Sequence, residues 1–459
     1  MSANTQASER LEIYRDIYRG NVPKRVPVTN PLALDAMAQY AGANVADVYW
    51  DMTKAEPIFD KVCADFPADS IPGGTRRYPS FYQLLGSKPF VMSSTGNMQH
   101  PEVIGMEVED YDYFCSSPYD CIIERILPRL YTELDGPAEK RALSLSKAFR
   151  TWSDEMASVG ALRGKIAAKY GFPSIPGGAT TAPFDFIADF FRGFSGISMD
   201  IRRHSEKVKA ACEAITPILI KKGQLMPPHA GAEMGMTIIP LHMAPYLRTK
   251  DAELYYFPTL KKQVEGLSEM GINVQLFVEA DYDRYLDNLQ EMPEKTILRF
   301  EMGDPKVIKQ KLGKKFIISG LYPISLLMTG TKEQCVDKAK ELLDILAPGG
   351  GYIFDFDKGI LNLMDNVAEN LRAVLEYVTA NGSYTVEERA GNVEIKPRPN
   401  RNKEIVTEIE GNINSKYYTT WPDYKQKNPN LYQGIDNIIG PKIKRYEDIM
   451  FAFIINLCS

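Results

Sequence analysis

The sequence has little cysteine and histidine, the two residue types that most often build thiolate and imidazole metal sites. Its 459 residues include six cysteines, none of them in a CxxC pair, and four histidines. Cysteines scattered over so long a chain are typical of reduced thiols, and they argue against a disulfide scaffold or a thiolate zinc site. The sequence also lacks GxSxG, HExxH, a Walker loop and a GxGxxG after a strand, so it carries no familiar catalytic signature.

Long apolar runs and a strong charge of either sign are missing as well. The longest apolar run, residues 449–458, is far shorter than the ~20 residues that a membrane helix needs. A net charge of -5 indicates neither a nucleic-acid surface nor a polybasic membrane contact. The opening stretch MSANTQASERLEIYRD is polar, so we expect no signal peptide and a soluble cytoplasmic protein.

What the second half does contain is a regular alternation of short apolar runs and amphipathic helical stretches. In TKEQCVDKAKELLDIL, apolar residues recur at helical spacing, Thr331 suits a helix start and the following PGGG suits a stop. This alternation predicts an α/β fold with a parallel sheet covered by helices. The expected strands are residues 236–243, 272–280, 296–302, 314–322 and 350–357.

The first half is richer in helix, and the end of the chain differs in composition. Residues 25–28 (RVPV) are a candidate first strand after an opening helix, with helical patterns at 142–170 and 204–222. After about residue 385 the sequence becomes polar and basic and then ends in an apolar MFAFII. Because an exposed segment of this kind would aggregate, we expect it to pack on the main domain or on a second subunit.

Polar residues gather at the C-terminal ends of the expected strands, which in a barrel meet at one rim. One histidine with several carboxylates could hold zinc through nitrogen and oxygen ligands, or could bind an organic cation or a polyol instead. The alternatives without a binding role are a hydrogen-bonded structural histidine and aspartates that cap a helix. Glu279 is harder to dismiss, because it follows Phe277 and Val278 directly and a buried carboxylate is costly without a partner. The strand-end residues are His242, Glu279, Glu301, Tyr322, Asp355 and Asp357.

Two arginines stand in a Gly/Pro-rich loop, SIPGGTRRYPS. Arg76 and Arg77 could bind the carboxylate of a substrate. Paired surface arginines are more often simply solvated, so the loop alone does not decide between these readings.

Several segments together resemble the uroporphyrinogen decarboxylase superfamily, and most closely its corrinoid-linked methyltransferase (O-demethylase-like) branch. They include RLEIYRDIYRGNVPKRVPV, HPEVIGMEVEDYDYFCSSPYD, APFDFIADFFRGFSGISMD and GLYPISLLMTGTKEQ. The resemblance implies a (β/α)8 TIM barrel with N-terminal helical additions over residues 8–385. Residues 386–459 lie outside it and are expected to form a C-terminal extension.

The resemblance also bears on the chemistry. Decarboxylases of the family carry an arginine-rich loop for porphyrinogen carboxylates, whereas TNPLALDAMAQYAG at residues 29–42 has no arginine. This difference argues against tetrapyrrole decarboxylation. By the same resemblance Asp69 falls in the region of the family's catalytic aspartate and Arg192 in its Arg-Gly segment. We therefore expect substrate contacts from Asp69, Arg76, Arg192 and Asp355.

For the methyltransferase branch, the resemblance implies zinc-assisted transfer of a methyl group from a small, for example methoxylated aromatic, substrate. The acceptor would be a corrinoid carried by a separate protein, because no corrinoid-binding signature is present. Glu279 stands where thiol-activating members have a cysteine, so the candidate zinc ligands are His242, Glu279 and Glu301. His242, Glu279 and Tyr322 are the candidate catalytic residues. A homodimer is expected from family habit. Two alternatives stay open: a metal-free lyase acting on a small carboxylic acid, and a non-catalytic binding barrel that has lost the family's metal.

Overall fold

The computed structural model describes most of the chain. Residues outside the description include the loop residue Arg76. The described residues are 2–73, 77–94, 96–173, 175, 177–225, 234–364, 366–394, 402–430 and 434–459.

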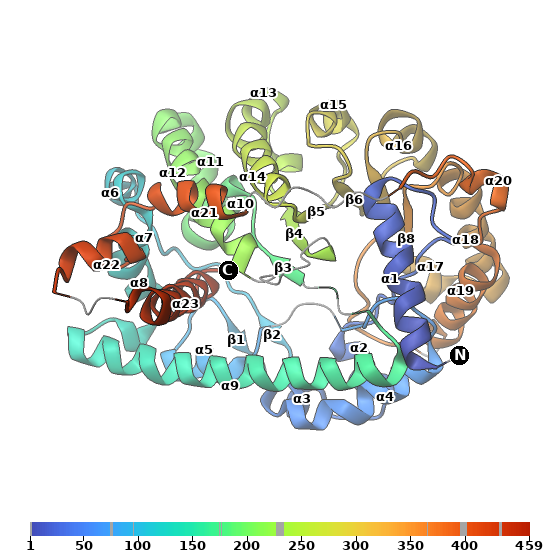
Figure 1. Cartoon of the computed structure of the whole chain (residues 1–459), viewed down its shortest axis with the longest axis horizontal. Coiled ribbons are helices and arrows are strands. Elements are labelled where there is room, and N and C mark those ends of the chain that lie inside the picture. The colour runs from blue at the N-terminus through green and yellow to red at the C-terminus, as the bar shows by residue number, and fades with distance from the viewer. Residues whose placement is uncertain are drawn as a thin grey trace.

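Six parallel strands form the main sheet, paired in sequence order β3-β4-β5-β6-β7-β8. Residues 236–356 supply the last five of them, close to the expected positions, so the prediction of a parallel α/β sheet is confirmed. In Figure 1 the strands follow a curved path with helices on its outer side. The strands are β3 (Gly177–Ala179), β4 (Met236–Leu241), β5 (Asn273–Val278), β6 (Ile297–Phe300), β7 (Ile317–Tyr322) and β8 (Tyr352–Phe356).

Each strand from β4 onward is followed by a helix that covers the sheet, as the hydrophobic spacing predicts. α18 begins as expected at Thr331, whose hydroxyl accepts from the N–H of Gln334 while the Gln334 side chain accepts from the N–H of Thr331. This capping box satisfies two backbone donors that would otherwise lack partners. The covering helices are α14 (Phe257–Glu269), α15 (Leu286–Gln290), α16 (Pro305–Leu312), α18 (Lys332–Leu346) and α19 (Val367–Asn381).

Two extended segments continue the strand order beyond β8. Val28 and Phe354 form a parallel bridge, so the expected first strand at 25–28 lies beside β8, although it makes only isolated bridges. The N–H of Asp69 then donates to Val28 O at 2.9 Å, and the N–H of Gly73 to Leu32 O at 3.1 Å. These contacts give eight neighbouring segments in the order of a (β/α)8 barrel. Among the described residues no ladder joins the second segment to β3, so the fold is TIM-barrel-like with that side not closed by strand pairing.

The floor of the barrel is closed by α1 (Ala3–Arg19). Tyr14, Ile17 and Tyr18 of this helix pack in one cluster with Ile297, Ile317 and Ile353, which lie at or near the first positions of β6, β7 and β8. Because the N-terminal ends of the strands are sealed, access to the interior is from their C-terminal ends.

The N-terminal additions are helical, with one small hairpin. α9 (Ala138–Tyr170) runs along the lower edge of the molecule in Figure 1. The antiparallel pair β1 (Val91–Met92) and β2 (Met98–Gln99) lies apart from the main sheet. The other helices of this half before residue 183 include α2 (Leu34–Tyr40), α3 (Val45–Trp50), α4 (Glu56–Asp65), α5 (Pro79–Leu85), α6 (Tyr111–Ser116), α7 (Pro118–Cys121) and α8 (Leu127–Leu130).

The apolar end of the chain is buried within this helical part. α23 (Asp436–Asn456) inserts Phe453, whose ring lies 5.4 Å from that of Phe149 and 5.5 Å from that of Trp152 on α9. Lys221, on the barrel helix α12 (Ser205–Leu225), forms ion pairs with Glu410 and Asp448 of the last segment, both at 2.8 Å. The division of the chain at residues 385 and 386 stays a prediction. Among the described residues, no helix combines the length and apolar character that crossing a bilayer requires.

Candidate active site at the barrel rim

Alternation along the paired strands defines which side chains face the barrel interior. Phe277, Arg299, Ser319 and Ile353 are register partners on β5 to β8, and Ile353 belongs to the cluster that seals the floor. Since side chains two residues apart share a face, Glu279, Glu301 and Asp355 lie on the same inner side. His242 directly follows β4, so it comes to the same rim as Glu279 and Glu301, with Asp355 below them. Asp357 instead accepts from the N–H groups of Ile324 and Lys358 at 3.1 and 2.7 Å.

His242 is held by two aspartates that follow β3. Its Nδ1 lies 3.0 Å from Asp189 Oδ1, and its backbone N–H donates to Asp185 Oδ2 at 2.9 Å. Asp185 belongs to α10 (Pro183–Ile187) and Asp189 to the π-helix η5 (Ala188–Arg192). The hydrogen bond to Asp189 raises the pKa of His242 to about 9, although partial burial opposes the rise. At neutral pH the ring is therefore an imidazolium, with Nε2 making no hydrogen bond to a described residue.

Asp185 organises the turn that carries this histidine. Its carboxylate also accepts from the N–H of Met243 at 2.9 Å and from the hydroxyl of Tyr256 at 2.7 Å. Burial raises the pKa of Asp185 above its usual range, and the charge of Asp189 adds to the rise. A buried carboxylate with this many donors fixes the backbone after β4 and so fixes where His242 points.

Glu279 is the rim carboxylate without a hydrogen-bond partner among the described residues. Its side chain is partly buried, and burial raises its pKa, while the charge of His242 acts in the opposite direction. A carboxyl group of raised pKa beside an imidazolium is the kind of pair that can hold and move protons.

Glu301, by contrast, is already engaged. One of its oxygens accepts from the N–H of Ala280 at 2.9 Å and the other pairs with Lys358. Burial opposes ionisation, but Lys358 and this N–H outweigh it and hold the pKa of Glu301 below its usual range. Ala280 has φ of 63°, which is uncommon for a residue with a Cβ and turns its N–H toward Glu301.

These contacts test the expected zinc site. His242 and Glu279 each keep a free ligand atom, but Glu301 is taken by a lysine and a backbone donor. Within the part of the chain that the structure describes, no three His, Cys, Asp or Glu side chains gather closely enough to hold a metal ion. The described residues thus do not fit a three-ligand zinc site, and zinc stays a prediction of the resemblance.

One layer below the rim, Asp355 lies where the sequence predicts, but its partner was not anticipated. Asp355 Oδ2 is 3.1 Å from Arg299 Nε, and Oδ1 accepts from the Thr29 hydroxyl and from the N–H of Phe356. A positive charge that could hold a substrate inside the barrel thus comes from Arg299, a strand residue that the sequence analysis did not single out.

The remaining predicted residues do not meet at this site. Tyr322 is fully buried on the outer side of β7, where its hydroxyl donates to Cys335 O of α18 at 2.9 Å. Its expected catalytic role is therefore not supported by its position. Asp69 is also buried. Its carboxylate accepts hydrogen bonds from Nη1 and Nη2 of Arg25, both at 2.6 Å, and from the N–H of Val28 at 2.8 Å. It pins the first two barrel segments together instead of facing a substrate.

Of the expected arginines, Arg192 is not placed at the rim. Arg192 is buried. Its Nε and Nη2 donate to the Asp200 carboxylate at 2.6 and 3.2 Å, and its Nη1 donates to Met106 O at 2.5 Å. All of its nitrogens are occupied, so it serves the packing of the N-terminal additions. Arg76 lies outside the described residues. Its neighbour Arg77 is placed over the ring of Phe90, 4.5 Å from the centroid.

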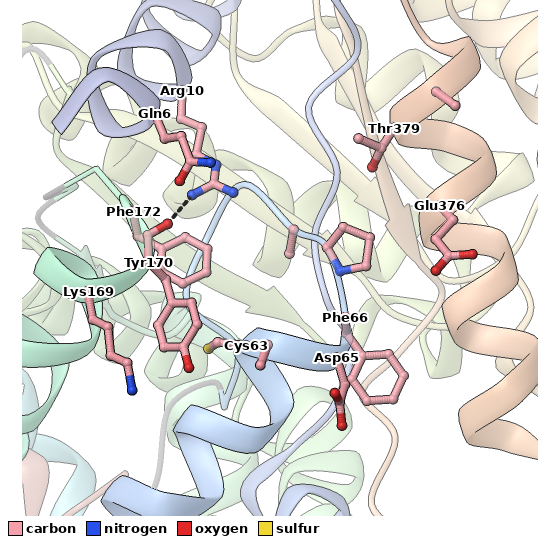
Figure 2. A pocket seen from close by; sticks show the side chains of 14 residues that line it. Gln6, Arg10, Cys63, Asp65, Phe66, Lys169, Tyr170, Phe172, Glu376 and Thr379 are labelled. Carbon is pink, nitrogen blue, oxygen red and sulfur yellow. Dashed lines mark hydrogen bonds between the residues drawn. The ribbon is translucent and has the colours of Figure 1, made fainter. Parts of the chain in front are cut away.

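A separate cavity of about 580 Å³ lies between α1, α4, the end of α9 and α19, and it shares no residue with the rim. Figure 2 shows Arg10 reaching into it, yet this arginine donates to Tyr170 O and Gly171 O at 2.7 and 2.8 Å. The adjacent Cys63 is a poor nucleophile, because burial raises the pKa of its thiol to about 12. Neither Arg10 nor Cys63 therefore offers a free reactive group in this cavity.

Asp185, Asp189 and Arg299 were missed by sequence reasoning. The two aspartates stand four residues apart in APFDFIADFF, a spacing that places both on one helical face. That spacing was the available signal, although the strand before it, β3, was not expected from the sequence. Arg299 could have been found by noticing a charged residue inside the apolar run TILRFEM.

Comparisons with known proteins bear on the family. A solved structure, a methyltransferase from Methanosarcina mazei, is similar over 83% of this chain and 99% of its own, with a TM-score of 0.53 and 15% sequence identity. At this identity the likeness supports the barrel fold alone. No curated protein matches the sequence significantly. The sequence model of the family described as "Uroporphyrinogen decarboxylase (URO-D)" matches residues 137–380, more than half of the chain. The chain therefore belongs to the uroporphyrinogen decarboxylase family.

Proposed function

We propose that this protein is a methyltransferase that moves a methyl group between a small methylated substrate and a corrinoid protein. Family membership supports an enzyme built on this barrel, and the similar fold named as a methyltransferase supports the reaction class. Neither the corrinoid partner nor the substrate is contained in the structure, so both belong to the proposal.

The observation that carries the proposal is the His242–Asp189 pair beside the unpartnered Glu279. When a methyl group leaves an oxygen, the oxygen is left as an alkoxide or phenoxide that must be neutralised. An imidazolium held at Nδ1 by Asp189 has its Nε2–H free to donate to that oxygen. Glu279 then stands beside the histidine to return the proton.

The balance of the step is simple. The O–CH3 bond breaks, the methyl group passes to the corrinoid of the partner, which supplies the nucleophile when bound, and the proton of His242 joins the oxygen. The barrel binds the substrate, orients the oxygen toward His242 and limits the access of water. No step is assigned to a metal.

A second candidate, a metal-free lyase of the same family acting on a small carboxylic acid, is favoured by one observation. It needs a cation for the substrate carboxylate, and Arg299 supplies one inside the barrel. Loss of CO2 from a carboxylic acid without any methyl transfer would support this reading over the first.

The test is methyl transfer from methoxylated aromatic compounds to free reduced cobalamin, followed by the absorbance of methylcobalamin. General acid–base catalysis contributes about 10²- to 10⁴-fold, so we expect His242→Gln to slow transfer by about that factor. His204→Gln, the same change in a histidine outside the site, is the control and should keep wild-type turnover. Unchanged turnover in His242→Gln would refute the assignment.

Metal analysis belongs to the same experiment. About one zinc per chain in the wild type, lost in both His242→Ala and Glu279→Ala, would restore zinc as the group that stabilises the leaving oxygen. Protein without zinc that still transfers methyl groups would support proton donation by His242.

A further inference from the structure

Two inward-facing side chains of β5 and β6 keep partial solvent exposure above the buried floor of the barrel. The floor residues Ile297, Ile317 and Ile353 are 0%, 3% and 5% exposed. The next inward residues, Phe277 on β5 and Arg299 on β6, are only partly buried. Solvent therefore reaches the inner face of β5 and β6 as far down as Arg299, and we call this partly exposed region above the isoleucines the well.

Arg299 is oriented within this well by fixed partners. Its Nε lies 3.1 Å from Asp355 Oδ2, and Nε and Nη2 donate to Phe356 O at 3.2 and 3.0 Å. The guanidinium carbon lies 4.7 Å from the centroid of the Phe277 ring. Nη1 makes no hydrogen bond to any residue that the structure describes, so one edge of the guanidinium is left for a ligand.

Asp355 orients Arg299 but pairs with its Nε alone, so the other N–H groups of the guanidinium are not taken by this carboxylate. Its Oδ1 is occupied by the Thr29 hydroxyl and the N–H of Phe356, so only Oδ2 faces Arg299. A guanidinium that is aligned by one carboxylate atom and one carbonyl keeps its remaining N–H groups for a second anion.

We propose that Arg299 is the anchor for an anionic group of the substrate, and that the substrate is a small aromatic carboxylic acid whose methylated oxygen lies at the end opposite the carboxylate. This inference rests on the proposed function for the identity of the reacting end.

The distance between anchor and rim sets the length of the ligand. Arg299 lies on β6 and Glu301 directly follows this strand, two residues further along, which corresponds to about 7 Å in the strand direction. A para-substituted benzene ring spans about this length between its two substituents. Phe277, beside the guanidinium, offers an aromatic surface on which such a ring can pack.

The test compares the binding of 4-methoxybenzoate with that of its neutral amide, 4-methoxybenzamide, by isothermal titration calorimetry of the full-length protein. Charge-assisted hydrogen bonds predict that the acid binds about ten-fold to hundred-fold more tightly than the amide. Arg299→Gln should remove this preference. Arg248→Gln, which changes an exposed arginine that pairs with Asp251, should keep it.

Two further variants keep the test decisive. Because Arg299→Gln leaves Asp355 without its cation, the double variant Arg299→Gln/Asp355→Asn removes both charges and should fold while showing no preference. Arg299→Lys keeps a charge and should retain part of the preference. Equal binding of acid and amide to the wild type, no binding of the acid, or a preference that survives in the double variant would overturn the proposal.

Binding is measured without a methyl acceptor, so the two proposals can fail separately. Tight, Arg299-dependent binding of the acid without methyl transfer would refute the proposed function and leave the anion anchor standing. Methyl transfer from neutral substrates that is independent of Arg299 would support the proposed function and refute the anion anchor.

Discussion

The replacement Asp189→Asn tests the central feature of the site, because it keeps the shape of the side chain and removes its charge. A rise of the His242 pKa from 6.5 to about 9 corresponds to about 3.4 kcal/mol between the charged and neutral ring. The imidazole is 45% exposed and the Asp189 side chain 21% exposed. Solvent-screened ion pairs are worth about 0.2–1 kcal/mol, so we expect the pair to contribute about 1 kcal/mol to stability.

The sign of the pH dependence follows from the direction of the pKa change. Because the folded state binds the proton of His242 more tightly than the unfolded state, this contribution is fully present below pH 6.5. It is lost as pH rises through about 9. Asp189→Asn should therefore lower the free energy of unfolding by about 1 kcal/mol at pH 6 and by almost nothing at pH 10.

The direct assay is NMR titration of the protein labelled with ¹⁵N-histidine. With four histidines in the chain, the His242 signals are identified by their loss in His242→Gln. We expect its pKa to fall toward 6.5 in Asp189→Asn and its alkaline titration to disappear. If His242 titrates near 6.5 in the wild type, or if its pKa is the same in Asp189→Asn, the reasoning about an imidazolium at the rim is wrong.

Three further outcomes are expected from urea unfolding and activity measurements. Phe453→Ala should cost about 3–5 kcal/mol, because it removes a fully buried ring between α9 and α23; a loss under 1 kcal/mol would contradict that packing. Asp69→Asn should cost about 3–5 kcal/mol, because Arg25 loses the charge that compensates its burial; wild-type stability would show the pair to be dispensable. Tyr322→Phe should cost about 1 kcal/mol through the lost bond to Cys335 O and leave turnover unchanged; a large loss of turnover with wild-type stability would restore its expected catalytic role.

The strands were predictable because their patterns are local. β4 to β8 are apolar runs bounded by turn residues, and the capping residue Thr331 is read directly from the sequence. The first barrel segments were harder, because residues 25–32 make only isolated bridges and their place beside β8 depends on contacts more than 300 residues away. The burial of Phe453 against α9 is of the same long-range kind.

At the site, strand alternation was sufficient for some residues and insufficient for others. The rim position of His242, Glu279 and Glu301 could be predicted because a strand end fixes which rim a side chain reaches, whereas their roles stay predictions. Tyr322 was misread because it lies on the outer face of β7, and one residue along a strand decides between the interior and the helices. The partner of Glu301 could not be foreseen, since Lys358 comes from the loop after β8.

The proton donor and the proposed anion anchor depend on different parts of the barrel. His242 takes its charge and orientation from α10 and η5, through Asp189 and Asp185, whereas Arg299 is aligned by β8 through Asp355 and Phe356 O. A substrate bound at both ends therefore reaches from His242, directly after β4, to Arg299 on β6. Changes in α10 or η5 should slow methyl transfer while leaving acid binding intact, because they reach only the rim end of the substrate. Changes around Asp355 should weaken binding and leave the pKa of His242 where Asp189 sets it.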